Sequence, residues 1–152
     1  MFIDLIIGSL AILVNMVIQV AAVVVAVSYI MHRMNMGKMT PGIYTDIKLM
    51  GVILAVLFIG HELQFAAWAA IFVWVGEFSD FKTAFYHSVV NFTSLGYGDI
   101  VMSEKWRLLG ALEAANGVLM FGLTASSFLA VMTRLITRHK RVVEVRKKHL
   151  DF

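Results

Sequence analysis

The chain has 152 residues, of which 60% are hydrophobic and only 15% charged, and its mean hydropathy is +0.82. Soluble domains carry roughly 25% charged residues, so this composition excludes an ordinary soluble globule and indicates a membrane protein. The chain contains no cysteine, which excludes disulfide frameworks, thiolate metal sites and thiol catalysis. Because a membrane helix uses about 20 apolar residues, three spans and their connections nearly fill the length, and the expected fold is an all-α membrane protein.

The first segment, residues 1–31, is almost continuously apolar. Its first charge is Asp4, and the run is longer than the short apolar region that follows the basic start of a secretory signal. We therefore expect a retained N-terminal transmembrane helix that crosses the membrane with some tilt. The polar stretch 32–48, which holds the single proline, Pro41, is predicted to be a cytoplasmic connector.

The rest of the chain contains two more long apolar runs, predicted to be an outer helix at 49–76 and an inner helix at 106–135. Between them, Asp80 or Ser79 can cap a helix at 81–93, which at about 1.5 Å per residue is too short to cross a bilayer. We expect a re-entrant half-helix there, followed by a glycine-rich loop at 94–99.

The basic residues are distributed unevenly along the chain. The 32–48 connector holds three Lys or Arg and the stretch from Arg134 to the end holds seven, whereas the opposite side holds three. The positive-inside rule therefore places the connector and the C-terminal tail, 136–152, in the cytoplasm, and the N-terminus outside an inner or plasma membrane. A basic tail directly after a span predicts contact with the lipid bilayer and its anionic lipids, and not with nucleic acid.

The loop after the half-helix carries a specific motif, which reads Thr93, Ser94, Leu95, Gly96, Tyr97, Gly98 and Asp99. It resembles the signature of the potassium-channel pore-loop superfamily, usually Thr-Thr-Val-Gly-Tyr-Gly-Asp, whose backbone carbonyls replace the hydration shell of the permeant ion. Consecutive carbonyls point the same way only if the backbone repeatedly takes a positive φ, which glycine tolerates at little cost.

The resemblance covers residues 49–135 and implies a pore domain of outer helix, pore helix, selectivity filter and inner helix. It implies that ions bind at Ser94, Leu95, Gly96, Tyr97 and Gly98, with K⁺ held as the permeant ion by the first four of these, and with no cofactor. One loop lines only one side of an ion, so four copies are needed and a homotetramer is expected. The implied function is passive, potassium-selective conduction, and not catalysis.

Several residues are candidate supports of the filter. Tyr86 and His87 occupy the positions of the family's paired tryptophans, so the resemblance implies a hydrogen bond between His87 and the filter aspartate. Glu113 in the inner helix either touches the rear of the filter or faces a water-filled crevice. The complete set of candidate supports is Tyr86, His87, Asn91, Thr93, Asp99 and Glu113.

The filter departs from the family pattern at two positions. Ser94 replaces a threonine and keeps its hydroxyl, and Leu95 replaces a stiffer β-branched valine. These changes bear on selectivity more than on conduction, so a weakly selective cation channel of the same architecture is the first alternative.

The inner helix repeats a family spacing at Gly117 and Gly122, which are either gating hinges or sites of close helix packing. Phe121, Ala125 and Leu129 follow at intervals of four residues and are candidates for lining the inner cavity, with helix packing as the alternative.

A polar group is predicted near the middle of the first two spans. His61 and Glu62 lie in the second span, where ionisable groups are costly. Asn15 and Gln19 lie at a similar depth on one face of the first span. The preferred interpretation is a polar lock between the two helices, and a proton sensor is the alternative. A rival from another class is a membrane enzyme or proton-coupled carrier centred on His61 and Glu62, although no second ligand cluster and no nucleophile–base pair accompanies them.

Overall fold

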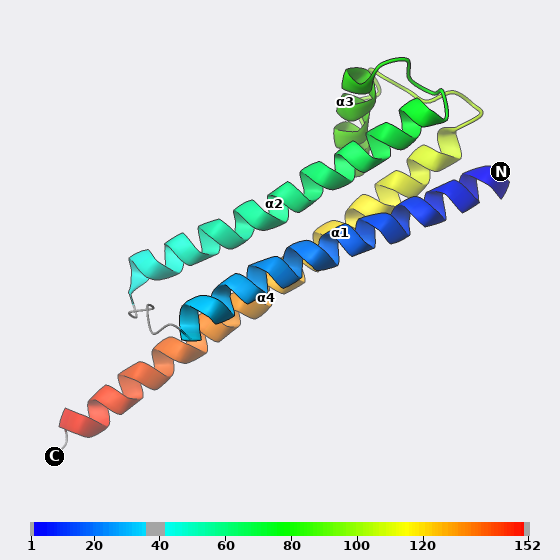
Figure 1. Ribbon diagram of the computed structural model, residues 1–152. Helices are drawn as coiled ribbons and strands as arrows, with labels where there is room; N and C mark the ends of the chain where they lie inside the picture. Colours follow the sequence, from blue (N-terminus) through cyan, green and yellow to red (C-terminus); the bar gives the residue numbers. More distant parts are fainter. Residues whose placement is uncertain (1, 36–41, 151–152) are drawn as a thin grey trace.

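The computed structural model describes residues 2–35 and 42–150, and every regular element in these residues is a helix. In chain order the helices are α1 (Phe2–Asn35), α2 (Ile43–Trp74), α3 (Phe81–Phe92) and α4 (Arg107–Leu150). The three long helices run along one another, and the short α3 lies at one end of the bundle (Figure 1).

Within the described residues, three segments are long and apolar enough to cross a membrane: Phe2–Arg33, Ile43–Trp74 and Arg107–Thr137. The protein is therefore an all-α, multi-pass membrane protein, as its composition predicted.

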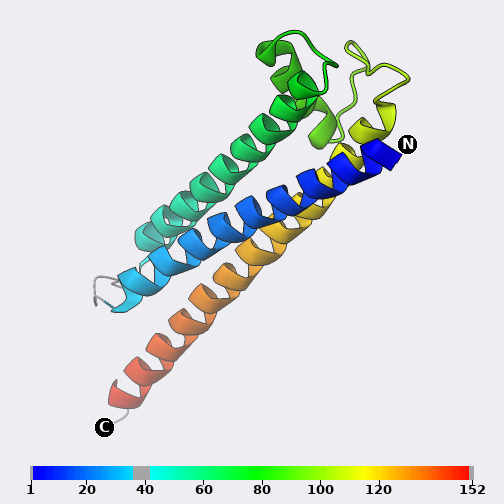
Figure 2. The same cartoon turned by 45° about the vertical axis from the view of Figure 1, so that its right-hand side comes forward.

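Helix α1 packs against both α2 and α4. It runs parallel to α4, so that the N-terminus of the chain and the start of α4 lie at the same end of the bundle, and antiparallel to α2 (Figure 2). A Cβ atom added at Gly8 would overlap Leu112, so this glycine allows α1 to approach α4 closely. The buried positions of α1 recur at intervals of three, four or seven residues and form one stripe, which consists of Asp4, Gly8, Ala11, Asn15, Gln19, Ala26 and Ile30.

In the part of the chain that the structure describes, the buried side chains form two apolar clusters. One cluster lies near α3 and is built around Trp68, Phe72 and Phe92. The other lies toward the opposite end of the bundle and joins Ile30, Leu57 and Leu135, among others, from α1, α2 and α4. The α3 end is thus supported by a well-packed aromatic core, in which ring centroids of neighbouring aromatic side chains lie 5.1 to 6.4 Å apart.

The helix bounds differ from the predicted ones mainly at polar ends. α1 continues four residues beyond 31, α2 begins at Ile43 where 49 was expected, and α4 continues to Leu150 through most of the predicted 136–152 tail. The predictions used hydropathy, which marks where a helix leaves the hydrocarbon and not where its backbone hydrogen bonds end. Residues 36–41 of the predicted connector, like residues 1, 151 and 152, lie outside the described residues.

Candidate functional site

Helix α3 is a capped half-helix. The Asp80 carboxylate accepts a hydrogen bond from the Thr83 backbone N–H at 2.9 Å, and this contact lowers the pKa of Asp80 below its ordinary value. The 12 residues of α3 extend about 18 Å, so the helix ends before it crosses a bilayer. At its other end, the Thr93 hydroxyl donates to the Val89 carbonyl at 2.7 Å.

The loop at 94–99 leaves α3 in an alternating backbone conformation. Ser94 (φ 58°), Gly96 (φ 58°) and Gly98 (φ 75°) have positive φ, and they alternate with residues that do not. The N–H groups of Leu95 and Gly96 both donate to the Val90 carbonyl at the end of α3. The two glycines were expected to adopt this conformation, but Ser94 was not, because a positive φ is uncommon for a residue with a side chain.

The aspartate at the end of the loop is held by a different residue from the one expected. The Tyr86 hydroxyl donates to Asp99 Oδ2 at 2.7 Å. This bond lowers the pKa of Asp99 and raises the pKa of Tyr86. The expected hydrogen bond from His87 to Asp99 is not formed.

His87 is instead buried against aromatic rings of α2 and the following turn. Its ring centroid lies 5.5 Å from that of Phe72 and 5.0 Å from that of Phe78. Burial is the main cause of a lowered pKa for this histidine, and a contact with the Ile100 backbone opposes the shift. Adjacent residues on a helix point about 100° apart, and here the Tyr86 side chain reaches Asp99 whereas that of His87 contacts the backbone of Ile100.

A buried carboxyl group joins α4 to α3 behind the loop. Glu113 is fully buried, and it accepts hydrogen bonds from Ser88 Oγ and Asn91 Nδ2, each at 2.6 Å. Asn91 Nδ2 also donates to the Gly110 carbonyl at 2.8 Å. Both hydrogen-bond partners of Glu113 belong to α3, so the structure places this side chain behind the half-helix from which the loop starts. The sequence analysis did not predict Ser88 as a partner of Glu113. The only feature that could have indicated it is its position one turn before Asn91 on the same helix.

The two glycines of α4 have different surroundings. A Cβ atom at Gly117 would overlap the Phe92 carbonyl at the end of α3, whereas a Cβ at Gly122 would meet nothing within 4 Å. Gly117 is therefore a close-packing site for the half-helix. Gly122 stays a candidate hinge, since nothing in the described part of the chain packs against it.

The candidate cavity residues lie on an outward face of α4. Ala125 and Leu129 are exposed in the single chain. Phe121 is 38% exposed, and its ring packs beside His61, with centroids 4.6 Å apart, and against Phe92. Their role in lining a cavity stays a prediction.

The polar group near mid-span joins three helices and not two. Gln19 of α1 donates to the Thr124 hydroxyl of α4 at 2.8 Å, and its Oε1 accepts from Gln64 of α2 at 2.8 Å. His61 Nε2 shares the same Thr124 hydroxyl at 2.9 Å.

The other two predicted members lie outside this network. Asn15 donates to the Ala11 carbonyl of its own helix, and no hydrogen bond connects Glu62 to the network among the described residues. Gln64 and Thr124 were missed as members because each is a common polar residue, and only the packing of three helices brings them together.

The comparisons with known proteins point to one family. Residues 61–134 match the family described as "ion channel". No curated protein and no solved structure matches the chain. The matched stretch runs from the middle of α2 through α3 and the 94–99 loop into α4, so it contains Glu113, the tyrosine–aspartate pair and the three loop positions of positive φ. This stretch is therefore similar to the ion channel family, in agreement with the pore-loop resemblance.

Proposed function

We propose that the chain is one subunit of a homotetrameric, potassium-selective channel whose filter is the 94–99 loop. The observation that carries the proposal is the alternation of positive φ at Ser94, Gly96 and Gly98 in an exposed loop. Such alternation directs successive carbonyls to one side. A row of carbonyls can replace the water shell of a monovalent cation, which otherwise costs of order 20 kcal/mol to bring into a low dielectric by the idealised Born estimate.

The direction of α3 supports a cation as the permeant species. The loop begins where α3 ends, so the C-terminal end of this helix, with its partial negative charge, lies at the inner end of the loop. Asp99 adds a carboxylate at the other end, and its lowered pKa favours the ionised form. Both features attract cations to the ends of the filter.

The need for several copies follows from the loop itself. Irregular backbone at membrane depth is tolerated only where it is buried in protein or lines water. Residues 93–99 are exposed in the single chain, and four copies around an axis give each of these loops a neighbour and a central path. The positive-inside rule orients each subunit with its N-terminus outside and its C-terminus in the cytoplasm of the cell membrane.

The test is ion flux through the purified full-length chain in lipid vesicles, with potassium and sodium compared under imposed gradients. We expect Gly96→Ala and Gly98→Ala to lose potassium selectivity, since a methyl group penalises the positive φ at each site by about 1 to 2 kcal/mol per subunit.

Gly76→Ala is the matched control. Gly76 has φ 75°, as Gly98 has, and an added Cβ meets nothing within 4 Å at either position, but Gly76 lies in the turn after α2. The same backbone strain outside the filter should leave selectivity unchanged. Undiminished selectivity in both filter variants would refute the filter assignment.

The first alternative, a weakly selective cation channel, is favoured by Leu95, whose side chain is 55% exposed in the single chain and so does not brace the loop from within its own subunit. Comparable potassium and sodium flux through the wild type would select this alternative. The rival of an enzyme or carrier centred on His61 and Glu62 has less support, because His61 Nε2 is hydrogen-bonded to the Thr124 hydroxyl and Glu62 does not join this interaction.

A further inference from the structure

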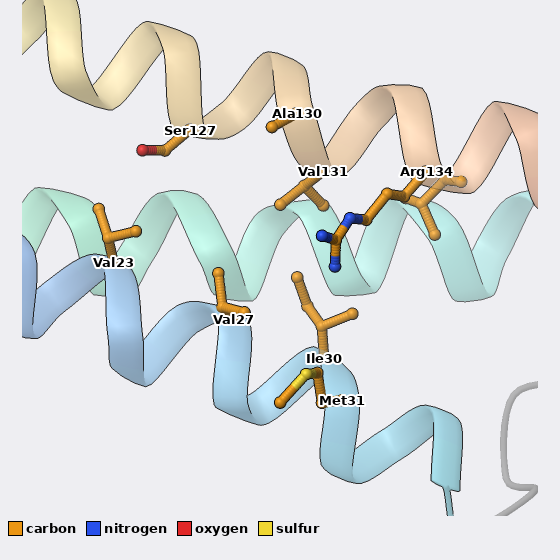
Figure 3. A pocket seen from close by; sticks show the side chains of 9 residues that line it. Val23, Val27, Ile30, Met31, Ser127, Ala130, Val131 and Arg134 are labelled. Carbon is orange, nitrogen blue, oxygen red and sulfur yellow. The ribbon is translucent and has the colours of Figure 1, made fainter.

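A groove between α1 and α4 has no part in the proposed conduction path. It lies in the half of the bundle away from α3, and Figure 3 shows its lining side chains. The space inside the groove is about 180 Å³. An apolar cavity of about 150 Å³ is large enough to admit a benzene-sized molecule, so the groove has room for a segment of a hydrocarbon chain.

The groove is apolar along its length and basic at one end. Val27 and Ile30 of α1 face Val131 of α4 along the walls. Arg134 extends from α4 across the groove, and its guanidinium lies near Ile30 (Figure 3). None of the described residues that line the groove is acidic, so the lining itself offers this cation no carboxylate.

The basic end of the groove lies at a membrane surface. Arg134 is three residues before Thr137, where the candidate span of α4 ends, and Met31 on the opposite wall is two residues before Arg33, where the span of α1 ends. An arginine at this depth reaches the headgroup layer while its stem stays among apolar groups. Anionic lipids are the partners that basic groups meet at the cytoplasmic surface.

We propose that the groove binds one phospholipid with an anionic headgroup. The Arg134 guanidinium holds the phosphate, for which its planar fork of donors is suited, and an acyl chain lies along Val27, Ile30 and Val131. A free phosphate would leave the apolar walls uncovered, and an uncharged lipid would leave the guanidinium without an anion. The bound lipid fills the space between α1 and α4, and so couples the N-terminal helix to the inner helix.

The experiment is native mass spectrometry of the full-length protein in neutral detergent, with phosphatidylglycerol or phosphatidylcholine added at low mole ratio. Neutral micelles have no anionic surface, so general attraction of the basic tail to a membrane does not contribute. We expect the wild type to retain about one phosphatidylglycerol per chain. Arg134→Gln should weaken this binding about tenfold or more, as for loss of a charged hydrogen bond, and Arg134→Lys should weaken it less.

Two variants isolate the groove. Arg33→Gln removes one positive charge at the same end of the bundle from a residue that does not line the groove, and it should change binding less than about twofold. Ala130→Phe fills the groove and keeps Arg134, and it should abolish retention of the lipid. Excess inorganic phosphate should not displace the lipid. Helical content by circular dichroism checks that each variant is folded.

Four results would overturn the proposal: no preference for phosphatidylglycerol in the wild type, equal losses in Arg134→Gln and Arg33→Gln, full retention in Ala130→Phe, or displacement by phosphate. No preference for phosphatidylglycerol would indicate that a neighbouring subunit or an uncharged chain occupies the groove. Equal losses in the two arginine variants would indicate that the lipid is attracted by the overall positive charge and not by Arg134.

Discussion

Tyr86 and His87 are adjacent in sequence but have different contacts beside the 94–99 loop. Tyr86 is hydrogen-bonded to Asp99, whereas His87 packs against aromatic rings. Tyr86 holds Asp99 through a hydrogen bond that lowers the pKa of the carboxyl group and raises the pKa of the phenol. This bond contributes fully above the ordinary pKa of Asp99 and is lost only as the pH falls through the lowered value. Between pH 5 and 8 this hydrogen bond therefore stays intact. Any pH dependence of channel opening in this range must come from another residue.

We expect His87 to cause a pH dependence of channel opening in this range. Burial lowers its pKa in the folded protein, so the unfolded chain binds more protons as the pH falls through the ordinary value of about 6.5. The contribution of His87 to stability is therefore present at higher pH and decreases on acidification. We expect open times of single channels to shorten between external pH 8 and 5, and His87→Gln, which cannot titrate, to remove most of this dependence. An identical pH profile in the variant would contradict this role.

A second prediction for a single residue concerns the buried carboxyl group of Glu113. Glu113→Ala leaves the Ser88 hydroxyl without its acceptor and removes one of the two acceptors of Asn91 Nδ2, which should cost about 1 to 3 kcal/mol per subunit. Glu113→Gln should cost less, because its amide can accept from Asn91 and donate to the Ser88 hydroxyl. Thermal unfolding of the assembled protein measures both. Glu104→Ala, which removes an exposed ion pair with Arg107, is the control and should change stability by less than about 1 kcal/mol. Equal effects of the two alanine variants would show that Glu113 does not hold α3.

At the scale of elements, the close contact between α3 and α4 depends on the absence of a side chain at Gly117. Gly117→Ala places a methyl group where the Phe92 carbonyl lies, so α3 must move, and we expect a loss of at least about 1 to 3 kcal/mol in stability and a disturbed filter. Gly122→Ala meets nothing and should instead stabilise α4 by up to about 1 kcal/mol, through helix propensity. The unfolding temperature should fall in Gly117→Ala and rise in Gly122→Ala. A lower unfolding temperature in Gly122→Ala would show that this glycine is also a close-packing site.

The sequence predicted features whose cause is local and missed those that depend on packing. The cap at Asp80 and the short length of α3 were foreseen, because capping and hydropathy act within a few residues. The partner of Asp99 was assigned to His87 and proved to be Tyr86, since sequence alignment with a motif does not fix the rotation of a helix. The positive φ of Ser94 has no signal of its own in the sequence.

Longer-range contacts follow the same rule. Two polar residues in α1 and two in α2 indicated a contact between these helices, but the hydroxyl that Gln19 and His61 share belongs to Thr124 of α4. Only the docking of α1 against both partners brings these groups together. The sequence analysis compared the depth and spacing of polar residues in two helices only. It therefore could not predict that a third helix supplies the shared partner.

At the scale of the whole molecule, the network around Gln19 is expected to hold the N-terminal helix to the helices of the pore. Gln19→Leu removes a donor to Thr124 and an acceptor for Gln64, and hydrogen bonds between membrane helices contribute about 0.6 to 2 kcal/mol each. We expect a corresponding loss of stability for the assembled protein in mild detergent, measured by thermal unfolding. Glu62→Gln, which changes a residue outside the network, is the control and should be nearly neutral.

A double-mutant cycle decides whether Gln19 acts through Thr124. Thr124→Val keeps the shape of the side chain and removes the shared hydroxyl, so its effect should overlap that of Gln19→Leu. We expect the double variant to be less destabilised than the sum of the single ones by about 0.5 kcal/mol or more, as for residues in direct contact. Strict additivity would show that the two side chains act independently, and that α1 is held to α4 by apolar packing alone.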